Sequence, residues 1–247
     1  FSAAVTGVTV DFGGGGGDSL YLAVGTNNLS VANIESVTGN TGDDTLTGAW
    51  YGTFAVDGGG GTDVLNLHSG GANNISITDV DTVNGGSATD TVTLAVAGST
   101  TVSNVENIYG SSMADTLVVS DAAHGINIIG GGGADMLTGG SGNDIFKYSS
   151  ASESASGNGD TITNFDAVSL EVLDFSAFMS GSFSFLGDEN STFSGGGNAS
   201  ARFNDSTDLL EVDTDGVSGA DMEITLTGVA LSDLDYTDFT GGVAPAL

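Results

Sequence analysis

The segment Gly130–Lys147 reads GGGGADMLTGGSGNDIFK, which is two consecutive copies of the nonapeptide Gly-Gly-x-Gly-x-Asp-x-(large apolar)-x. A short pattern that recurs in one register is the mark of a stacked repeat architecture. Four copies in the chain are intact and three are degenerate, which is too many for chance. The copies are Gly13–Tyr21, Gly39–Thr47, Gly58–Asn66, Gly85–Thr93, Gly110–Val118, Gly130–Thr138 and Gly139–Lys147.

Each part of the nonapeptide has a physical role. In the first six residues, here called the glycine turn, glycine lets backbone carbonyl groups converge on one point, and aspartate adds charge. Calcium is a hard cation that takes about 6–8 oxygen ligands, so such a turn suits it. The last three residues predict a short strand whose central apolar side chain points inward. Stacked copies would build a parallel β-solenoid with calcium between neighbouring turns.

The candidate calcium ligands are the glycines and acids of these turns, together with Asp160 further along the chain. They are Gly13, Gly16, Asp18, Gly39, Gly42, Asp44, Gly58, Gly61, Asp63, Asp90, Gly130, Gly131, Gly133, Asp135, Gly139, Gly140, Gly142, Asp144 and Asp160. Ala88 and Met113 replace a glycine in the copies that contain Asp90 and Asp115. For these two copies, packing without metal is the alternative.

The spacing of the acids predicts the size of a coil. The sixth-position aspartates are separated by 26, 19, 27, 25, 20 and 9 residues. We expect coils of roughly 19–27 residues, each with one aspartate turn and one longer excursion. The excursions share a second pattern of alternating polar and apolar residues, as in a half-buried strand. They are Asn33–Gly39, Asp79–Gly85 and Asn104–Gly110.

Composition limits the classes of partner. The chain has 247 residues, with 25 Asp and 7 Glu against two basic residues, and a net charge of −30. This charge repels nucleic acid and anionic lipid. No apolar stretch is long enough for a membrane-spanning helix, so neither nucleic-acid binding nor membrane insertion is expected. With no cysteine and 39% hydrophobic residues, the fold must rest on packing and metal instead of disulfides.

The repeats resemble those of the repeats-in-toxin (RTX) family, and the C-terminal part resembles serralysin-type secreted proteins. The resemblance is carried by Phe146–Tyr148, by Asp160–Phe165 (D-x-I-x-x-F) and by Leu173–Phe178. It implies an all-β chain, with a calcium-binding parallel β-roll or β-solenoid over residues 1–148. A C-terminal β-rich capping domain over 149–247 would carry a type I secretion signal. It further implies export from a Gram-negative bacterium, and folding at the higher calcium concentration outside the cell or at its surface.

Catalytic patterns are missing from the sequence. His68 and His124 are the only histidines, and no H-E-x-x-H or G-x-S-x-G motif is present. We therefore expect no enzymatic activity and assign both histidines to loops. Trp50 and Tyr51 are either a sugar-binding platform or, more simply, packing residues.

Three functions are open at this point. The first is a secreted structural protein that self-associates into an S-layer-like lattice, sheath or filament. The second is the calcium-folding and secretion module of a larger extracellular enzyme, with a catalytic domain before Phe1. The third is an adhesin or carbohydrate-binding module that contacts a cell-surface glycan. In each case helix should be scarce, and the cap should bury Phe165, Leu173, Phe175, Phe178, Phe183, Phe185 and Leu226.

Overall fold

The computed structural model describes residues 3–120, 124–167, 171–179, 183–193, 195–217 and 219–240. The chain divides into two compact units. The first comprises residues 1–111 and 116–121, and the second comprises residues 112–115 and 122–247. The two are described separately below.

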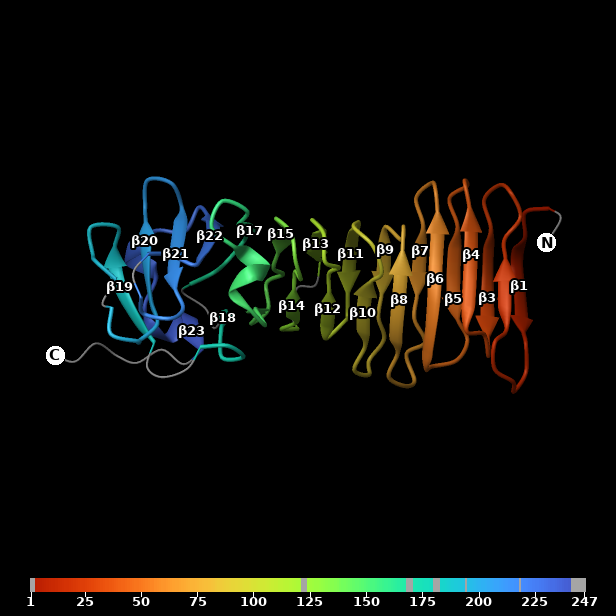
Figure 1. Ribbon diagram of the computed structural model, residues 1–247. Coiled ribbons are helices and arrows are strands. Elements are labelled where there is room, and N and C mark those ends of the chain that lie inside the picture. Colours follow the sequence, from red (N-terminus) through yellow and green to blue (C-terminus); the bar gives the residue numbers. More distant parts are fainter. Residues whose placement is uncertain are drawn as a thin grey trace. The chain divides into compact units, whose positions relative to one another are not determined.

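The first unit is a stack of parallel β-coils (Figure 1). Its odd-numbered strands form one parallel sheet and its even-numbered strands form another. The strands of the odd sheet are β1 (Thr6–Asp11), β3 (Asn28–Ala32), β5 (Thr45–Gly48), β7 (Val64–Asn66), β9 (Thr82–Asn84), β11 (Ser99–Ser103) and β13 (Thr116–Val119). Those of the even sheet are β2 (Ser19–Tyr21), β4 (Ser36–Asn40), β6 (Thr53–Gly59), β8 (Asn74–Thr78), β10 (Thr91–Leu94) and β12 (Asn107–Tyr109).

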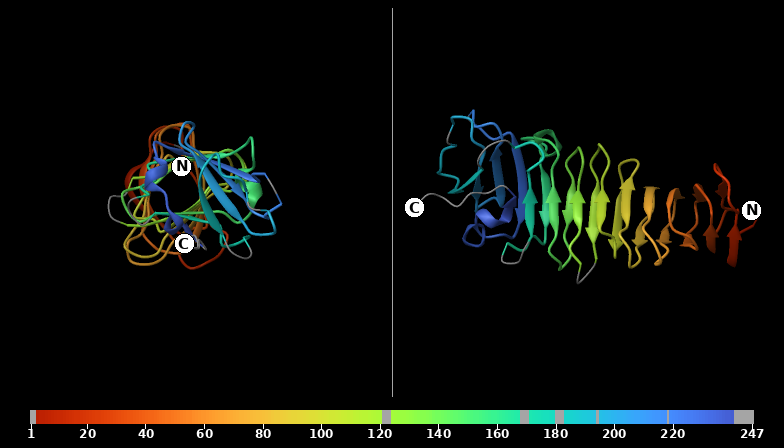
Figure 2. Two further views of the ribbon diagram at one scale, coloured as in Figure 1. Left: turned by 90° about the vertical axis from the view of Figure 1, so that its left-hand side faces the viewer. Right: turned by 90° about the horizontal axis from the view of Figure 1, so that it is seen from below.

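The core of this unit is built as the nonapeptide predicts. Each repeat ends in a short strand, and the central apolar residue of that strand is buried, while its neighbours are more exposed. Figure 2 shows the stacked coils that carry these strands from two further directions. This alternation follows from the two-residue period of a strand. The buried central residues are Leu20, Leu46, Leu65, Val92 and Leu117.

The expected coil of 19–27 residues is too long for many coils of the first unit. Paired strands of successive coils there are offset by 16–22 residues in sequence. Each coil has two turns, one before each sheet, and either turn can hold a repeat. Asp18 precedes β2 of the even sheet, whereas Asp44 precedes β5 of the odd sheet. Their separation of 26 residues is therefore about one and a half coils, which the sequence spacing alone did not reveal.

Glycine is required where the backbones of neighbouring coils meet. A Cβ on Gly39 would overlap the carbonyl oxygen of Gly58, and a Cβ on Gly85 would overlap that of Asn104. The first glycine of these two turns thus permits close stacking of coils, a role separate from any metal contact.

The second unit continues the parallel pattern and then changes it. One sheet has the order β15-β17-β22-β21-β20-β19, in which β20, β21 and β22 are antiparallel neighbours and the other pairs are parallel. The other sheet, β14-β16-β18-β23, is parallel where its pairs are described. The strands are β14 (Asn127–Ile129), β15 (Met136–Thr138), β16 (Ile145–Lys147), β17 (Asp160–Thr163), β18 (Val172–Asp174), β19 (Ser184–Asp188), β20 (Ser200–Asn204), β21 (Leu209–Asp213), β22 (Met222–Thr227) and β23 (Phe239–Thr240).

The aromatic core of the second unit largely matches the expectation. Phe165, Leu173, Phe175, Phe183 and Leu226 are buried. Phe178 and Phe185 are only half-buried, because each lies at the rim of the cluster. Phe178 meets the edge of Phe175, and Phe185 stacks on Phe239.

Helix is scarce, as predicted. The described residues contain three short 3₁₀ helices, η1 (Ala151–Ser154), η2 (Leu231–Asp233) and η3 (Tyr236–Asp238). No helix in this part of the chain is long and apolar enough to cross a membrane. The parallel ladders also continue beyond residue 148, where we expected the cap to begin, since β17 pairs with β15 and β18 pairs with β16.

Candidate calcium sites

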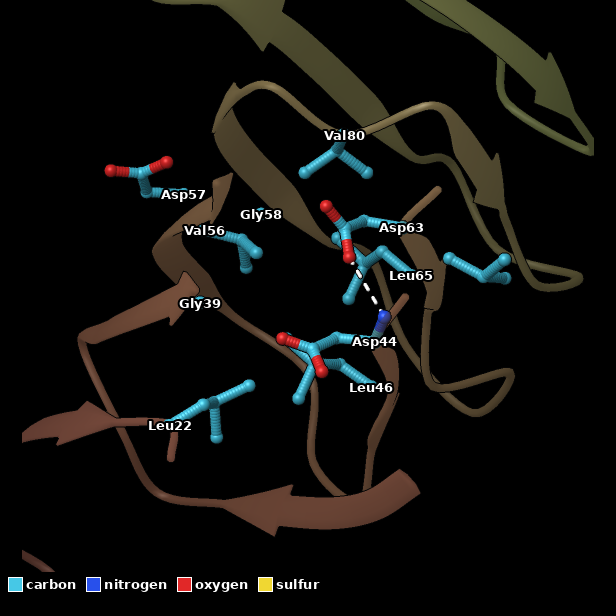
Figure 3. Close-up of a pocket in the computed structure, with 11 residues that line it drawn as sticks. Leu22, Gly39, Asp44, Leu46, Val56, Asp57, Gly58, Asp63, Leu65 and Val80 are labelled. Carbon is cyan, nitrogen blue, oxygen red and sulfur yellow. Dashed lines mark hydrogen bonds between the residues drawn. The ribbon is translucent and has the colours of Figure 1, made fainter. Parts of the chain in front are cut away.

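Each coil is tied to the next by a carboxylate that accepts a backbone N–H. In the first unit, Oδ1 of Asp63 accepts the amide of Asp44 at 2.8 Å (Figure 3), and Oδ2 of Asp81 accepts the amide of Asp63 at 2.7 Å. In the second unit, Oδ1 of Asp135 accepts the amide of Asp115, and Oδ1 of Asp160 accepts the amide of Asp135, both at 2.8 Å. Within each unit, these bonded acids therefore lie in the turns of successive coils, each next to the other.

Several glycine turns face a second kind of turn, which we call the acidic turn. It has the pattern Asn/Asp-apolar-Asp/Glu. Its first residue has a left-handed φ of 46–52° in the first unit, which asparagine and aspartate tolerate better than most residues. Its apolar residue is buried, and its acid accepts the amide of the glycine turn's aspartate. The acidic turns of the first unit are Asn33–Glu35, Asp79–Asp81 and Asn104–Glu106.

The acids of these turns were missed by the sequence analysis. The excursions were read as strands, and only their later parts are strands, namely β4, β9 and β12. The signal was present, because each excursion begins with Asn or Asp and has an acid two residues later. Alternation alone does not distinguish a turn that precedes a strand from the strand itself.

A polar hollow of about 210 Å³ lies between a glycine turn and an acidic turn in the first unit. Gly59 and Gly61 line it on one side, and Asp79, Asp81 and Ser99 line the other. One oxygen of Asp81 is used by the Asp63 amide. Carboxylates opposite a glycine backbone offer the oxygen ligands that calcium prefers.

An equivalent hollow of about 120 Å³ lies in the second unit. Its glycine turn contributes Gly140, Ser141 and Gly142, and the following acidic turn contributes Asn164 and Asp166, with Glu171 beside them. Asn164 again has a left-handed φ, 63°. Oε2 of Glu171 accepts the amide of Asp166 at 2.8 Å.

The electrostatics of this second hollow call for a cation. Burial, together with the nearby charges of Asp144 and Asp166, raises the pKa of Glu171 to about 7. The only two basic side chains of the protein are engaged elsewhere, Lys147 with Asp174 and Arg202 with Glu211. Oxygen donors of like charge without a basic partner fit calcium, which would neutralise them.

Among the described residues of the parallel coils, three buried aspartates have one oxygen without a hydrogen-bond partner. These oxygens are Oδ2 of Asp63, Asp135 and Asp160. Burial raises the pKa of Asp63 and of Asp135 to about 6, and that of Asp160 to about 7. In the first two turns the leading glycine faces the carboxylate, since a Cβ on Gly58 would lie 2.7 Å from Oδ2 of Asp63 and one on Gly130 would overlap Oδ2 of Asp135.

Other predicted acids are bonded at both oxygens. Asp90 accepts the amides of Asn73 and Gly86, and Asp144 accepts those of Ile126 and Gly140. Asp44 accepts the amide of Asn27 through Oδ1 and the side chain of Asn40 through Oδ2. These carboxylates already hold coils together by hydrogen bonds.

The remaining predicted residues divide between stacking and turn roles. Gly39 and Gly42 pack against the backbone of the neighbouring coil, and Gly139 packs against the carboxylates of Asp144 and Glu171. Gly13, Gly131 and Gly133 have left-handed φ. Gly16 is exposed with open space around it. Asp18 is half-buried, and its amide donates a hydrogen bond to Oε2 of Glu35.

The enclosed cavity in Figure 3 is not a metal site. It is lined by Asp44 and Asp63 and by apolar side chains such as Leu46, Val56 and Val80, and its volume is about 10 Å³. That is the space of about one water molecule, too small for calcium with its shell of oxygens.

Parallel coils whose glycine turns face acidic turns define a calcium-binding type of β-roll. In comparisons with known proteins, residues 51–238 match the family described as peptidase M10 serralysin C terminal, and the chain belongs to this family. The RTX resemblance is thereby confirmed. The matched region is the C-terminal repeat region of these peptidases, not their catalytic domain, and RTX repeats of this kind bind calcium in general. A search of the curated proteins found no match.

The buried acids predict an unusual pH dependence for the calcium-free protein. Their folded-state pKa values of about 6–7 lie above the ordinary values, so their stabilising effect is complete below the ordinary pKa and is lost as pH rises through 6–7. In EGTA, the chain should have a higher urea midpoint at about pH 5 than at about pH 8, and calcium should reduce this difference by neutralising Glu171, which lines the second hollow. The pKa values of Asp11 and Glu223 are lowered, so these two acids change the stability only at more acidic pH. Equal urea midpoints in EGTA at both pH values would contradict the raised pKa values of these buried acids.

Asp81→Asn separates the structural from the metal-binding role of the acidic turn. Asparagine can still accept the amide of Asp63 through its side-chain oxygen, but it lacks the negative charge. We expect an unchanged circular dichroism spectrum with calcium and an affinity at this hollow that is lower by at least about tenfold in calorimetric titration. Glu189→Gln removes an exposed charge in the other unit and is the control. Wild-type affinity in Asp81→Asn would exclude a metal at this hollow.

Proposed function

We propose that this protein is a secreted calcium-binding β-solenoid without enzymatic activity, which folds outside the cell and then self-associates. The observation that carries the proposal is the pairing of a glycine turn with an acidic turn in consecutive coils. Two polar hollows lie at such pairings, one in each unit.

Calcium-dependent folding is supported by the balance of charge. The chain has a net charge of −30, and several of its acids lie in the turns of stacked coils, where they accept amides of the neighbouring coil. Without a cation, stacking brings like charges together in a partly desolvated place. Because a preformed site does not exist in the unfolded chain, calcium binding would contribute its free energy directly to folding. This suits export through a type I system of a Gram-negative bacterium, since RTX domains of the serralysin type are typically secreted in that way.

Self-association is supported by the first strand of the solenoid. Strand β1 pairs only with β3 among the described strands, and most of its residues are exposed. An open edge strand can pair with another chain. The outward residues of other strands in the same sheet are uncharged, as in Thr45 and Thr47 of β5 and Thr82 and Asn84 of β9, so these positions add no like charge to a contact with a second copy. An S-layer-like lattice, a sheath or a filament would result.

The family match favours a second candidate function. Because the chain resembles the C-terminal part of a peptidase, it can serve as the calcium-folding module of a larger extracellular enzyme. In that case the module would fold with calcium and stay monomeric.

One titration distinguishes the two functions. Purified chain is taken from EGTA to about 10 mM calcium, well above the affinity range of extracellular calcium modules. Circular dichroism follows folding, and light scattering with negative-stain microscopy follows assembly. Ordered sheets or filaments that form only with calcium are the expected result. Folding into a stable monomer would contradict self-association, and a chain that folds equally well in EGTA would contradict the calcium requirement.

A further inference from the structure

The loop between β21 and β22 brings three carboxylates together outside the glycine turns. An oxygen from each of Asp213, Asp215 and Asp221 lies within 4.8 Å of the others. Oδ1 of Asp213 accepts the amides of Gly216 and Asp215, and Oδ2 of Asp221 accepts the amide and hydroxyl of Thr214. These bonds fix the loop with its acids facing one another.

A second observation concerns Asp213, the last residue of β21 before this loop. Asp213 is completely buried, yet its Oδ2 has no hydrogen-bond partner. Ser200 lies directly opposite Asp213 in the antiparallel ladder of β20 and β21, so both side chains are on the same face of the sheet. Ser200 is also completely buried, and its hydroxyl likewise has no partner. Unsatisfied buried oxygens of this kind are costly unless something binds them.

No basic side chain compensates these acids. Arg202 lies on the neighbouring strand, but its guanidinium is held by Glu211, by the carbonyl of Ser191 and by the ring of Phe193. Lys147 pairs with Asp174. Carboxylate oxygens within 4.8 Å of one another repel unless a cation lies between them.

From this geometry we infer a divalent-cation site in the loop Asp213–Asp221, with calcium as the ligand. Oδ2 of Asp213 binds the ion from below, and the carboxylates of Asp215 and Asp221 bind it from the loop. The donors are all oxygen, without nitrogen or sulfur, which favours a hard cation over zinc. Asp215 is exposed, so water can complete the shell of the ion, and calcium accepts such irregular coordination better than magnesium, which needs a strict octahedron.

This site does not depend on the stacked coils. It belongs to the antiparallel part of the second unit, where β21 and β22 pair without a glycine turn. Its ion would fix the β21–β22 connection and the segment Gly195–Asn198 beside it, since Gly216 packs tightly against Asn198 and Gly197. The inference therefore goes beyond the proposed function and can survive its failure.

The test counts calcium ions on the full chain. Native mass spectrometry and calorimetry are applied to the wild type, to Asp215→Asn and to the control Asp233→Asn, an exposed acid in η2 outside the loop. We expect Asp215→Asn to bind one calcium ion fewer, with the other affinities unchanged. Asp233→Asn should match the wild type.

Hydrogen–deuterium exchange then shows which part of the chain has lost its calcium ion in Asp215→Asn. Calcium should slow exchange of the amides in the loop 214–221 in the wild type and in Asp233→Asn, but not in Asp215→Asn. Protection of the glycine turns should be the same in all three proteins. If Asp215→Asn has the wild-type calcium count and the wild-type protection of this loop, the inference is overturned.

Discussion

The structure depends on one interaction between coils, in which a turn carboxylate accepts the backbone amide of an acidic residue one coil earlier. Asp63 does this for Asp44, and Asp160 does it for Asp135. A hydrogen bond to a charged group contributes roughly 1.5–3 kcal/mol. The same bond fixes coil height and register, because the amide and the carboxylate belong to residues that lead into neighbouring strands.

This interaction brings its own difficulty, since the bonded residues are both acids. Their carboxylates repel one another, and the charges of Asp44 and Asp81 contribute to the raised pKa of Asp63. The two basic residues of the chain are occupied elsewhere. A calcium ion bound beside these turns would offset this repulsion. Burial is the main cause of the raised pKa values of Asp63, Asp135, Asp160 and Glu171, and the neighbouring negative charges add to it.

The glycine-turn repeat was enough to predict the fold class, because its strand positions have a fixed two-residue period. Leu65 is buried for this reason alone. Coil length was not predictable from the acids, since a repeat can occupy either of two turns and the sequence does not say which. The acidic half of the site was missed for a related reason. Asp81 and Glu171 belong to a different coil from the glycine turn they face, and only the stacking places them there. The loop at Asp213 lies in no repeat at all, so no spacing pointed to it.

The central claim is that calcium binds between the turns. A crystal structure of the chain grown with calcium, with anomalous diffraction collected at a long wavelength where calcium absorbs, tests it most directly. The account predicts anomalous peaks in two hollows, between Gly59–Gly61 and Asp79–Asp81 and between Gly140–Gly142 and Asp166–Glu171, with carboxylate oxygens at about 2.3–2.6 Å from each peak. Well-ordered coils with water alone in both hollows would show that stacking needs no cation, and would contradict the account.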